Sequence, residues 1–244
     1  MSMSPTSFFI SDIHLTLDRG EWEQNRRKRL YRFFELVKEE KGQLFIIGDF
    51  FDFWFEYKHV IAKDYLDVLF ELRQLRQAGI KIHFVLGNHD WWARDLLSDD
   101  FGIQVYRDDA VIAIDGQQVY LTHGDGLLEH DSGYRLLKRI IRHPVFVFLY
   151  RWLHPDIGIA TAQGVSQISR KYNSGGYGDK YFDELTGFAR TKWSEGNQLV
   201  VMGHYHLNKM ITEDGNTFVC LGDWIGQFTY GKLQEDNFTL EHWD

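Results

Sequence analysis

The segment "KIHFVLGNHDWW", residues 81–92, places an apolar, β-branched run directly against a cluster of polar side chains. Residues 81–86 predict a buried strand. The run ends at Gly87, and Asn88, His89 and Asp90 follow at once. Because these three side chains can bind a ligand, it matters whether other strands of the chain end in the same way.

Four more predicted strands end in the same way. Their last residues lead into "DIH" at 12–14, "GDFFD" at 48–52, "HGD" at 123–125 and "GHYH" at 203–206. In open α/β sheets, ligands bind beyond the carboxyl ends of the strands, so we expect all five motifs to meet at one site. An extended backbone would also place Asp12 and His14 on one side, and likewise His204 and His206. Glycines at 48, 87, 124 and 203 would allow these segments to approach closely.

The first half of the chain alternates between strand and helix patterns. Residues 25–40 carry Leu30, Phe33, Phe34 and Val37 on one helical face, and a second helix pattern over 63–79 ends at Gly79. Strand, helix, strand, helix, strand predicts a parallel sheet with right-handed crossovers. A short helix is expected after the third strand, at about 91–98.

The second half returns to strands after a long helical segment. Asp115-Gly116 lies between two alternating runs and predicts a hairpin, as does "EDGN" at 213–216. Between these strands, residues 126 to about 193 have mostly helical patterns. We therefore expect one domain over 1–244 with a helical cap inserted at about 126–193.

The amino-acid composition limits the kinds of molecule that this protein is expected to bind and the compartment in which it is expected to work. The net charge of −8 argues against non-specific nucleic-acid binding, which requires a basic face. Cys220 is the single cysteine, which suits a reducing compartment. The segment "MSMSPTSFFISD" lacks the features of a signal peptide, and there is no apolar run of about 18 residues. We expect a cytoplasmic protein with no obligate protein partner.

The predicted cap differs from the rest of the chain in charge. Residues 133–192 carry a net charge of +6, so the remainder carries −14. Within this segment "PVFVFLYRWL", residues 144–153, is strongly apolar, and Lys138, Arg139, Arg142 and Arg151 lie around it. Apolar aromatic residues flanked by Lys and Arg are typical of a membrane interface. Packing of the same helix on the core is an alternative that is compatible with this interpretation.

The residues at the five strand ends are carboxylates, imidazoles and one carboxamide, with no thiol. This set suits divalent Mn, Fe or Zn. The ligands are too many for one ion, which indicates two ions that share a carboxylate. Asp52 and Asp125 are candidates for orienting a ligand, with a loop cap as the alternative for Asp52. The other six histidines are interpreted as ordinary structural or surface residues: His59, His83, His130, His143, His154 and His242.

In their order along the chain, D-x-H, GDxxD, GNHD, HGD and GHxH resemble the motifs of the calcineurin-like metallophosphoesterase superfamily. The resemblance implies a four-layer αββα sandwich with a dinuclear centre. By motif position, one metal would be held by Asp12, His14, Asp49 and His206, and the other by Asp49, Asn88, His123 and His204. Asp49 would bridge the two ions, of which Mn is favoured, with Fe and Zn as alternatives. His89, oriented by Asp90, would stabilise the transition state or protonate the leaving oxygen.

Within that superfamily, "GDFFDFWFEY" and "HGDGLLEHDSGY" followed by a basic helical insertion resemble the UDP-2,3-diacylglucosamine pyrophosphatases of lipid A synthesis. The resemblance implies cleavage of this nucleotide-linked lipid to UMP and the diacylglucosamine 1-phosphate. It also implies a cap that binds acyl chains and contacts the inner membrane surface peripherally. Carried over by position, the substrate contacts are Asp131, Tyr134, Arg170, Lys171 and Asn173. The best-known members of that family have Arg where this chain has His89, which leaves the exact substrate open.

Two alternatives remain at this point. The first is a broader phosphodiesterase or phosphatase that acts on soluble nucleotides or phosphoproteins. The second is a non-catalytic scaffold with the same fold, although such proteins usually lose metal ligands and every ligand position here is filled.

Overall fold

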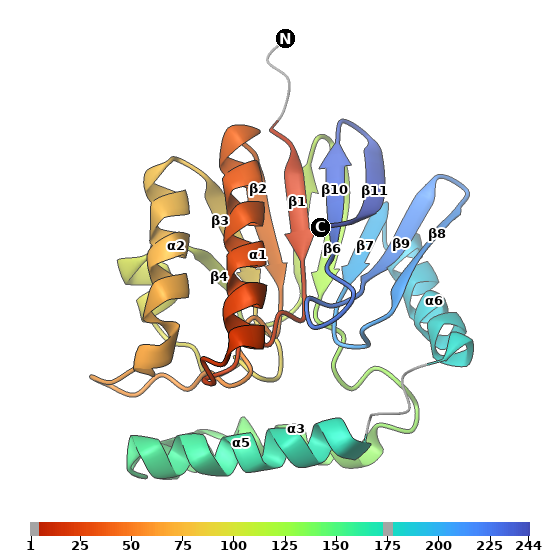
Figure 1. Ribbon diagram of the computed structural model, residues 1–244. Helices are drawn as coiled ribbons and strands as arrows, with labels where there is room; N and C mark the ends of the chain where they lie inside the picture. Colours follow the sequence, from red (N-terminus) through yellow and green to blue (C-terminus); the bar gives the residue numbers. More distant parts are fainter. Residues whose placement is uncertain (1–4, 173–177) are drawn as a thin grey trace.

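Two stacked β-sheets form the centre of the computed structural model, which describes residues 5–172 and 178–244 (Figure 1). The first sheet has the order β11 (Asn237–His242), β10 (Thr229–Gln234), β1 (Ser7–Ile10), β2 (Gln43–Ile47), β3 (Lys81–Val85) and β4 (Gln104–Tyr106). The second has the order β5 (Ala110–Ile114), β6 (Gln117–Thr122), β7 (Leu199–Met202), β9 (Asn216–Leu221) and β8 (Asn208–Glu213). Strands β1 to β4 are parallel, as are β6, β7 and β9.

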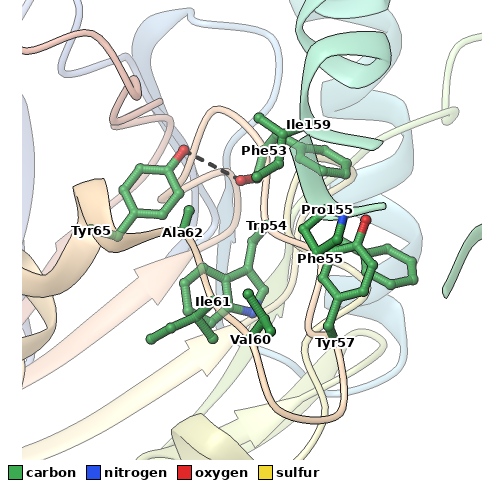
Figure 2. Close-up of a pocket in the computed structure, with 10 residues that line it drawn as sticks. All are labelled: Phe53, Trp54, Phe55, Tyr57, Val60, Ile61, Ala62, Tyr65, Pro155 and Ile159. Carbon is green, nitrogen blue, oxygen red and sulfur yellow. Dashed lines mark hydrogen bonds between the residues drawn. The ribbon is translucent and has the colours of Figure 1, made fainter. Parts of the chain in front are cut away.

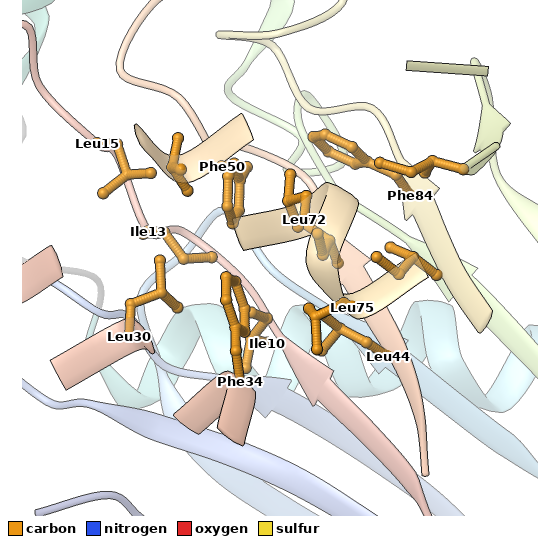
Figure 3. Packing of buried hydrophobic residues seen from close by; sticks show 14 of the residues in the cluster. Ile10, Ile13, Leu15, Leu30, Phe34, Leu44, Phe50, Leu72, Leu75 and Phe84 are labelled. Atoms are coloured by element: carbon orange, nitrogen blue, oxygen red, sulfur yellow. The ribbon is translucent and has the colours of Figure 1, made fainter. Parts of the chain in front are cut away.

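Alternation along the strands divides the apolar residues among three cores. Phe8 and Ile10 of β1 face helices α1 (Glu21–Glu39) and α2 (Leu66–Gln77), whereas Phe9 packs between the two sheets. Successive strand residues point to opposite faces, so a strand buried on both faces must be apolar throughout. Figure 3 shows the core beneath the helices, where Leu30 and Phe34 of α1 meet Ile10.

Helix α6 (Asp179–Ser194) covers the outer face of the second sheet through a third core that includes Leu185 and Ala189. The layers are therefore helices, sheet, sheet and helix, which confirms the predicted four-layer αββα sandwich. The hairpins expected at Asp115-Gly116 and at 213–216 are also present, as β5–β6 and β8–β9. Asp115 and Gly116 have φ values of 53° and 87°, the left-handed backbone that a tight hairpin turn requires.

The predicted cap segment divides into two parts. Helices α3 (Ser132–Ile141), α4 (Pro144–Arg151) and α5 (Pro155–Tyr172) are inserted between β6 and α6, and Figure 1 shows α3 and α5 lying across one end of both sheets. Helix α6, in contrast, belongs to the sandwich. None of the helices within residues 5–172 and 178–244 has the length and hydropathy that a bilayer span requires.

The helix expected at about 91–98 begins later than predicted. Only Leu96–Asp100 is helical, as one π-helical turn. The buried carboxylate of Glu56 accepts hydrogen bonds from the backbone N–H groups of Arg94, Asp95 and Leu96. A distant acid therefore satisfies the donors at the start of this turn, which a local pattern could not reveal.

His83 is an ordinary strand residue, as predicted. Its ring stacks on Phe45 at 4.5 Å between centroids and on Tyr106 at 6.0 Å, and Nδ1 lies 3.0 Å from the Tyr106 hydroxyl. Burial lowers the pKa of His83 to about 4, and the charges of Lys81 and Arg76 act in the same direction. The folded protein therefore holds this imidazole neutral.

Replacing His83 should reduce the acid sensitivity of the fold. The pKa in the folded protein lies below the unfolded value of 6.5, so the contribution to stability is present above pH 6.5 and is lost as the pH falls toward 4. For a partly exposed ring we expect His83→Phe to recover about 1 kcal/mol of the stability lost between pH 7 and pH 5. Urea unfolding of the metal-free protein at both pH values measures this difference. The exposed His59 supplies the control, His59→Gln, and equal losses in both variants would contradict the prediction.

Candidate metal centre

The carboxyl ends of β1, β2, β3, β6 and β7 bring the five sequence motifs to one edge of the sandwich, next to the cap (Figure 1). The backbone at these ends is not extended. Asp12, His14, Asp49, His204 and His206 have φ values of 54°, 44°, 51°, 67° and 53°. The expectation that an extended strand aligns Asp12 with His14 and His204 with His206 is therefore wrong, although all four side chains reach the site. Each of these non-glycine residues adopts a conformation that is strained by about 1 kcal/mol or more.

Glycine permits the strand ends to approach one another. A Cβ atom on Gly48 would lie 2.2 Å from His123 Nδ1, and one on Gly87 would lie 2.2 Å from Asp49 Oδ1. A larger residue at either position would push a site side chain out of place.

One group of potential ligands consists of Asp12, His14 and His206, whose ligand atoms all lie within 4.8 Å of one another. Asp12 Oδ1 is 3.7 Å from His14 Nε2 and 3.4 Å from His206 Nε2. The other oxygen, Oδ2, accepts hydrogen bonds from the Ser11 hydroxyl and from the backbone N–H of His204. One carboxylate oxygen is thus fixed by the protein while the other faces the imidazoles.

A second group consists of Asp49, His123 and His204, and Asn88 lies beside it. His123 Nε2 is 3.3 Å from Asp49 Oδ2 and 3.2 Å from Asn88 Oδ1. Asp49 Oδ2 is also 3.7 Å from His14 Nε2 in the first group, while Oδ1 accepts the backbone N–H of His89 at 2.9 Å. A single oxygen of Asp49 therefore faces both groups, as a bridging ligand requires.

Two of the imidazoles, His123 and His206, present Nε2 to the site because Nδ1 is held on the side away from it. His123 Nδ1 lies 3.0 Å from the Ile47 carbonyl oxygen, and His206 Nδ1 lies 3.4 Å from Asp223 Oδ2. A carbonyl oxygen only accepts hydrogen bonds, so His123 keeps a hydrogen on Nδ1, and Nε2 is the nitrogen that can bind a cation once it has lost its proton.

Mutual attraction of opposite charges governs the protonation of this cluster. Burial alone would raise the pKa of Asp12, but the imidazole of His206 holds it well below its usual range. Burial likewise opposes ionisation of His123 and His206, yet the Asp49 and Asp12 charges raise both pKa values to about 10. His204 lacks such compensation, and burial together with His123 lowers its pKa to about 4.

The residues fit a pair of divalent cations. Within the described residues, the buried Asp12 Oδ1 accepts no hydrogen bond. Such an atom is costly to bury unless a cation meets it. Carboxylate, imidazole and carboxamide donors suit Mn, Fe or Zn in the way that the sequence indicated.

The contacts of His89 correct one prediction. Its Nδ1 lies 2.6 Å from the backbone carbonyl oxygen of Asp52, and its Nε2 lies 3.8 Å from Asp49 Oδ2. The carboxylate of Asp90 instead accepts the backbone N–H groups of Gly87 and Phe50, at 2.6 and 2.8 Å. The expectation that Asp90 orients the His89 ring is therefore wrong, because Asp90 fixes the loop backbone. Burial and the Asp49 charge raise the pKa of Asp90 to about 7.

Asp223 supports His206 and was missed at the sequence level. Its Oδ2 lies 3.4 Å from His206 Nδ1, and its Oδ1 accepts backbone N–H groups of Ile225, Gly226 and Gln227. Gly222-Asp223 directly follows β9, so a sixth strand end carried the same signal as the other five.

Arg26, in α1, was also missed, and nothing in its local sequence marks it. Its buried guanidinium donates to the carbonyl oxygens of Ile13 and His14, and to that of Trp224 at 3.2 Å. It forms an ion pair with the equally buried Glu23 at 2.6 Å. Arg26 thus joins the loop of Asp12 and His14 to the loop that follows Asp223.

The expected orienting acids lie beside the site. Asp52 Oδ1 is 3.9 Å from His14 Nδ1. Asp125 accepts a hydrogen bond from the Tyr134 hydroxyl at 2.8 Å, and the Tyr134 ring centroid lies 6.2 Å from that of His204.

The other predicted substrate contacts lie farther along the cap. Asp131 precedes α3 and is 3.8 Å from His130 Nε2. Arg170 and Lys171 belong to α5, but their side chains are outside the described part of the structure, and Asn173 lies outside the described residues altogether.

A small apolar cavity separates the cap from the core near the site (Figure 2). Phe53, Phe55 and Tyr57 line one side, and Pro155 and Ile159 of α5 line the other. Trp92 forms a further contact between the core and the cap, because its Nε1 donates a hydrogen bond to the Ile141 carbonyl oxygen at 3.2 Å. Apolar surface therefore continues from the residue after Asp52 into the cap.

A family model described as calcineurin-like phosphoesterase matches residues 6–208. The chain belongs to this family. Membership implies divalent metal ions, and the two ligand groups, with a third formed by His14, Asp49 and His89 between them, offer positions for such ions. The predicted metal-dependent hydrolase is thereby confirmed at the level of the family.

Relatives and solved structures agree with this assignment. This phosphoesterase is 29% identical to UDP-2,3-diacylglucosamine hydrolase of Porphyromonas gingivalis over 253 aligned residues, 96% of each chain. It is 31% identical to the protein of that name from Aeromonas salmonicida, over 91% of this chain and 87% of the relative. The structure of an archaeal phosphodiesterase has the same fold, with a TM-score of 0.50 and 16% identity over 97% of this chain and 98% of the other.

Removing the shared carboxylate should empty the whole centre. Because Asp49 Oδ2 faces both ligand groups, Asp49→Ala is expected to lower bound Mn from about two ions per chain to fewer than half an ion. Elemental analysis after gel filtration measures the content, and the exposed Asp18→Ala serves as control. Retention of two ions by a folded Asp49→Ala protein would contradict the bridging assignment.

Asp223→Asn tests the support of His206. An asparagine keeps the oxygen that caps residues 225–227 but cannot accept the proton of His206 Nδ1. We expect Mn affinity to fall about 10- to 100-fold, as is usual for such supporting carboxylates. Competition with a fluorescent chelator measures this affinity. Asp236→Asn, on an exposed turn, should leave it unchanged.

Proposed function

We propose that this phosphoesterase hydrolyses the pyrophosphate of UDP-2,3-diacylglucosamine, releasing UMP and 2,3-diacylglucosamine 1-phosphate. The proposal is carried by one juxtaposition: two ligand groups that share Asp49 Oδ2 lie directly beside an apolar and basic cap. The relatives named UDP-2,3-diacylglucosamine hydrolases support the substrate.

The centre would hold two divalent cations, for which we propose Mn. Asp12, His14, Asp49 and His206 would hold one ion, and Asp49, Asn88, His123 and His204 would hold the other. When bound, the pair supplies positive charge that polarises the phosphoryl group and activates the attacking water. The chain's own contribution is to fix the donor atoms, through the contacts that hold Nδ1 of His123 and of His206 and one oxygen each of Asp12 and Asp49.

His89 is placed to act on the leaving group. The Asp52 carbonyl oxygen only accepts, so the ring proton of His89 remains on Nδ1, and Nε2 faces the site. A proton carried on Nε2 would then neutralise charge that develops on the departing phosphate oxygen. Asp52 orients this ring through its backbone, which any residue at that position could do.

The cap supplies contacts for the lipid half of the substrate. Phe148, Leu149 and Trp152 of the α4 region are 57%, 60% and 78% exposed, so one side of this helix faces solvent, while Tyr150 on another side packs on Phe55 at 4.7 Å between ring centroids. Acyl chains would enter the apolar space between cap and core, and Tyr134 and Asp131 would contact the polar portion of the substrate. We further propose that the exposed apolar and basic residues of the cap rest on the surface of the inner membrane.

Comparison of three substrates tests the proposed function. The Mn-loaded protein should cleave UDP-2,3-diacylglucosamine with a kcat/KM at least 100-fold higher than that for bis-p-nitrophenyl phosphate or for UDP-N-acetylglucosamine, which lacks acyl chains. A double variant, Phe148→Ser with Trp152→Ser, should lose activity on the lipid and keep it on the small diester. Equal turnover of all three substrates would favour a broader phosphodiesterase, and no turnover of any would favour a scaffold.

His89→Ala should separate catalysis from metal binding. The side chain is not among the proposed ligands, so metal content is expected to stay at the wild-type level while kcat falls about 10²- to 10³-fold. Stopped assays on the lipid substrate with parallel elemental analysis give both quantities. Loss of metal from this variant would instead identify His89 as a ligand.

A further inference from the structure

Helix α3 is held over the metal centre without hydrophobic burial. All its residues are described and none is buried, and Leu136, Leu137 and Ile140 are between 47% and 57% exposed. Most helices are fixed by burial of an apolar face. The position of α3 must therefore be set by its polar contacts.

Three side chains of α3 converge on one carboxylate oxygen. Tyr134, Lys138 and Arg142 follow one another at intervals of four residues, so they lie along one face of the helix. Asp125 Oδ2 is 2.8 Å from the Tyr134 hydroxyl, 2.7 Å from Lys138 Nζ and 3.2 Å from Arg142 Nη2. Lys138 Nζ also donates to the Asp125 carbonyl oxygen at 3.0 Å.

Asp125 connects this helix to the metal centre through a short path. It lies two residues after His123, and Tyr205, which separates His204 from His206, donates its hydroxyl to the Gly124 carbonyl oxygen at 2.8 Å. The carboxylate is 8% exposed, and its two cationic partners are 27% and 17% exposed. Charge-assisted hydrogen bonds at such a shielded position are stronger and more directional than those on an open surface.

The far end of α3 reaches the loop that carries Asn88 and His89. The Arg142 guanidinium lies over the Trp91 ring, 5.0 Å from its centroid, and the Ile141 carbonyl oxygen accepts the Trp92 indole N–H. Helix α3 thus contacts two loops of the site, Asp125 through the face that carries Tyr134, Lys138 and Arg142, and the tryptophans through its C-terminal end.

We propose that Asp125 is a positioning residue that aligns the cap with the metal centre, so that a substrate anchored in the cap presents its phosphate to the ions. Asp125 acts through Tyr134, Lys138 and Arg142 and does not itself touch the substrate. The predicted effect on turnover rests on the proposed lipid-linked substrate. The joint, by which we mean the contacts of Asp125 with Tyr134, Lys138 and Arg142, does not depend on that substrate.

Three variants test the role of the Asp125 carboxylate. Asp125→Asn keeps the size and one acceptor but removes the charge that pairs with Lys138 and Arg142. Asp125→Glu restores the charge. Glu213→Gln removes a carboxylate from an exposed ion pair with Arg190, far from the cap, and is the matched control.

With UDP-2,3-diacylglucosamine, Asp125→Asn should lower kcat about 10-fold and change KM less than twofold, because the substrate is still anchored in the cap but its phosphate is misplaced. Metal should remain bound, the loss with bis-p-nitrophenyl phosphate should be at least fivefold smaller than the loss with the lipid substrate, and Asp125→Glu should recover at least half of the loss. Amide hydrogen exchange of residues 132–141 should accelerate at least 10-fold in Asp125→Asn, while exchange in α1 should not change. The exchange measurement uses no substrate, so it tests whether Asp125 holds helix α3 even if the proposed function is wrong.

A double-mutant cycle with Lys138→Met distinguishes this joint from direct phosphate binding by the lysine. If Asp125 and Lys138 act as one unit, the double variant should lower kcat no more than the more severe single variant. A lysine that binds phosphate directly would instead make Asp125→Asn neutral or favourable and Lys138→Met harmful, which would overturn the proposal. Loss of metal and equal loss of both substrates in Asp125→Asn would also overturn it, as would unchanged exchange in α3.

Discussion

The left-handed backbone of the ligand residues is the constraint on which this fold depends. Asp12, His14, Asp49, His204 and His206 all adopt it without being glycine, at the points where strands of both sheets end. The strain is offset by contacts that arise elsewhere. The backbone N–H groups of Asp12 and His14 bond to the carbonyl oxygens of Gly48 and Asp49, and Arg26 holds the carbonyl side of the same loop. The three apolar cores of the sandwich keep these loops in register.

The same loops determine the electrostatics of the site. Asp12 and Asp49 each use one carboxylate oxygen to fix a backbone N–H group and turn the other toward imidazoles. Such an arrangement concentrates negative charge at a place where hydrogen-bond donors are too few to neutralise it. Cations complete it, and His89 adds an imidazole whose ring is fixed by a backbone carbonyl group and remains available for chemistry.

Periodicity and the grouping of polar residues at strand ends predicted the parallel sheet and the convergence of the motifs, whereas the four layers were implied by the resemblance to the phosphoesterase superfamily. Interactions that depend on tertiary placement were not visible. Every residue has a backbone carbonyl oxygen, so the sequence cannot show that the one of Asp52 contacts His89. Arg26 likewise resembles any other arginine on an amphipathic helix. Asp223 was different: it followed a sixth strand and could have been found. The division of the segment 126–193, with α6 in the sandwich, depends on a core formed with distant strands.

The absence of buried side chains in α3 and α4, both fully described, has a consequence for the history of this fold. Because α3 and α4 contribute so little to the interior, they can be replaced, lengthened or substituted without changes in the core of the sandwich. The part of the chain that selects the substrate can then change without the part that performs the hydrolysis. A protein that keeps this metal centre can act on different substrates when the cap between β6 and α6 is replaced by another.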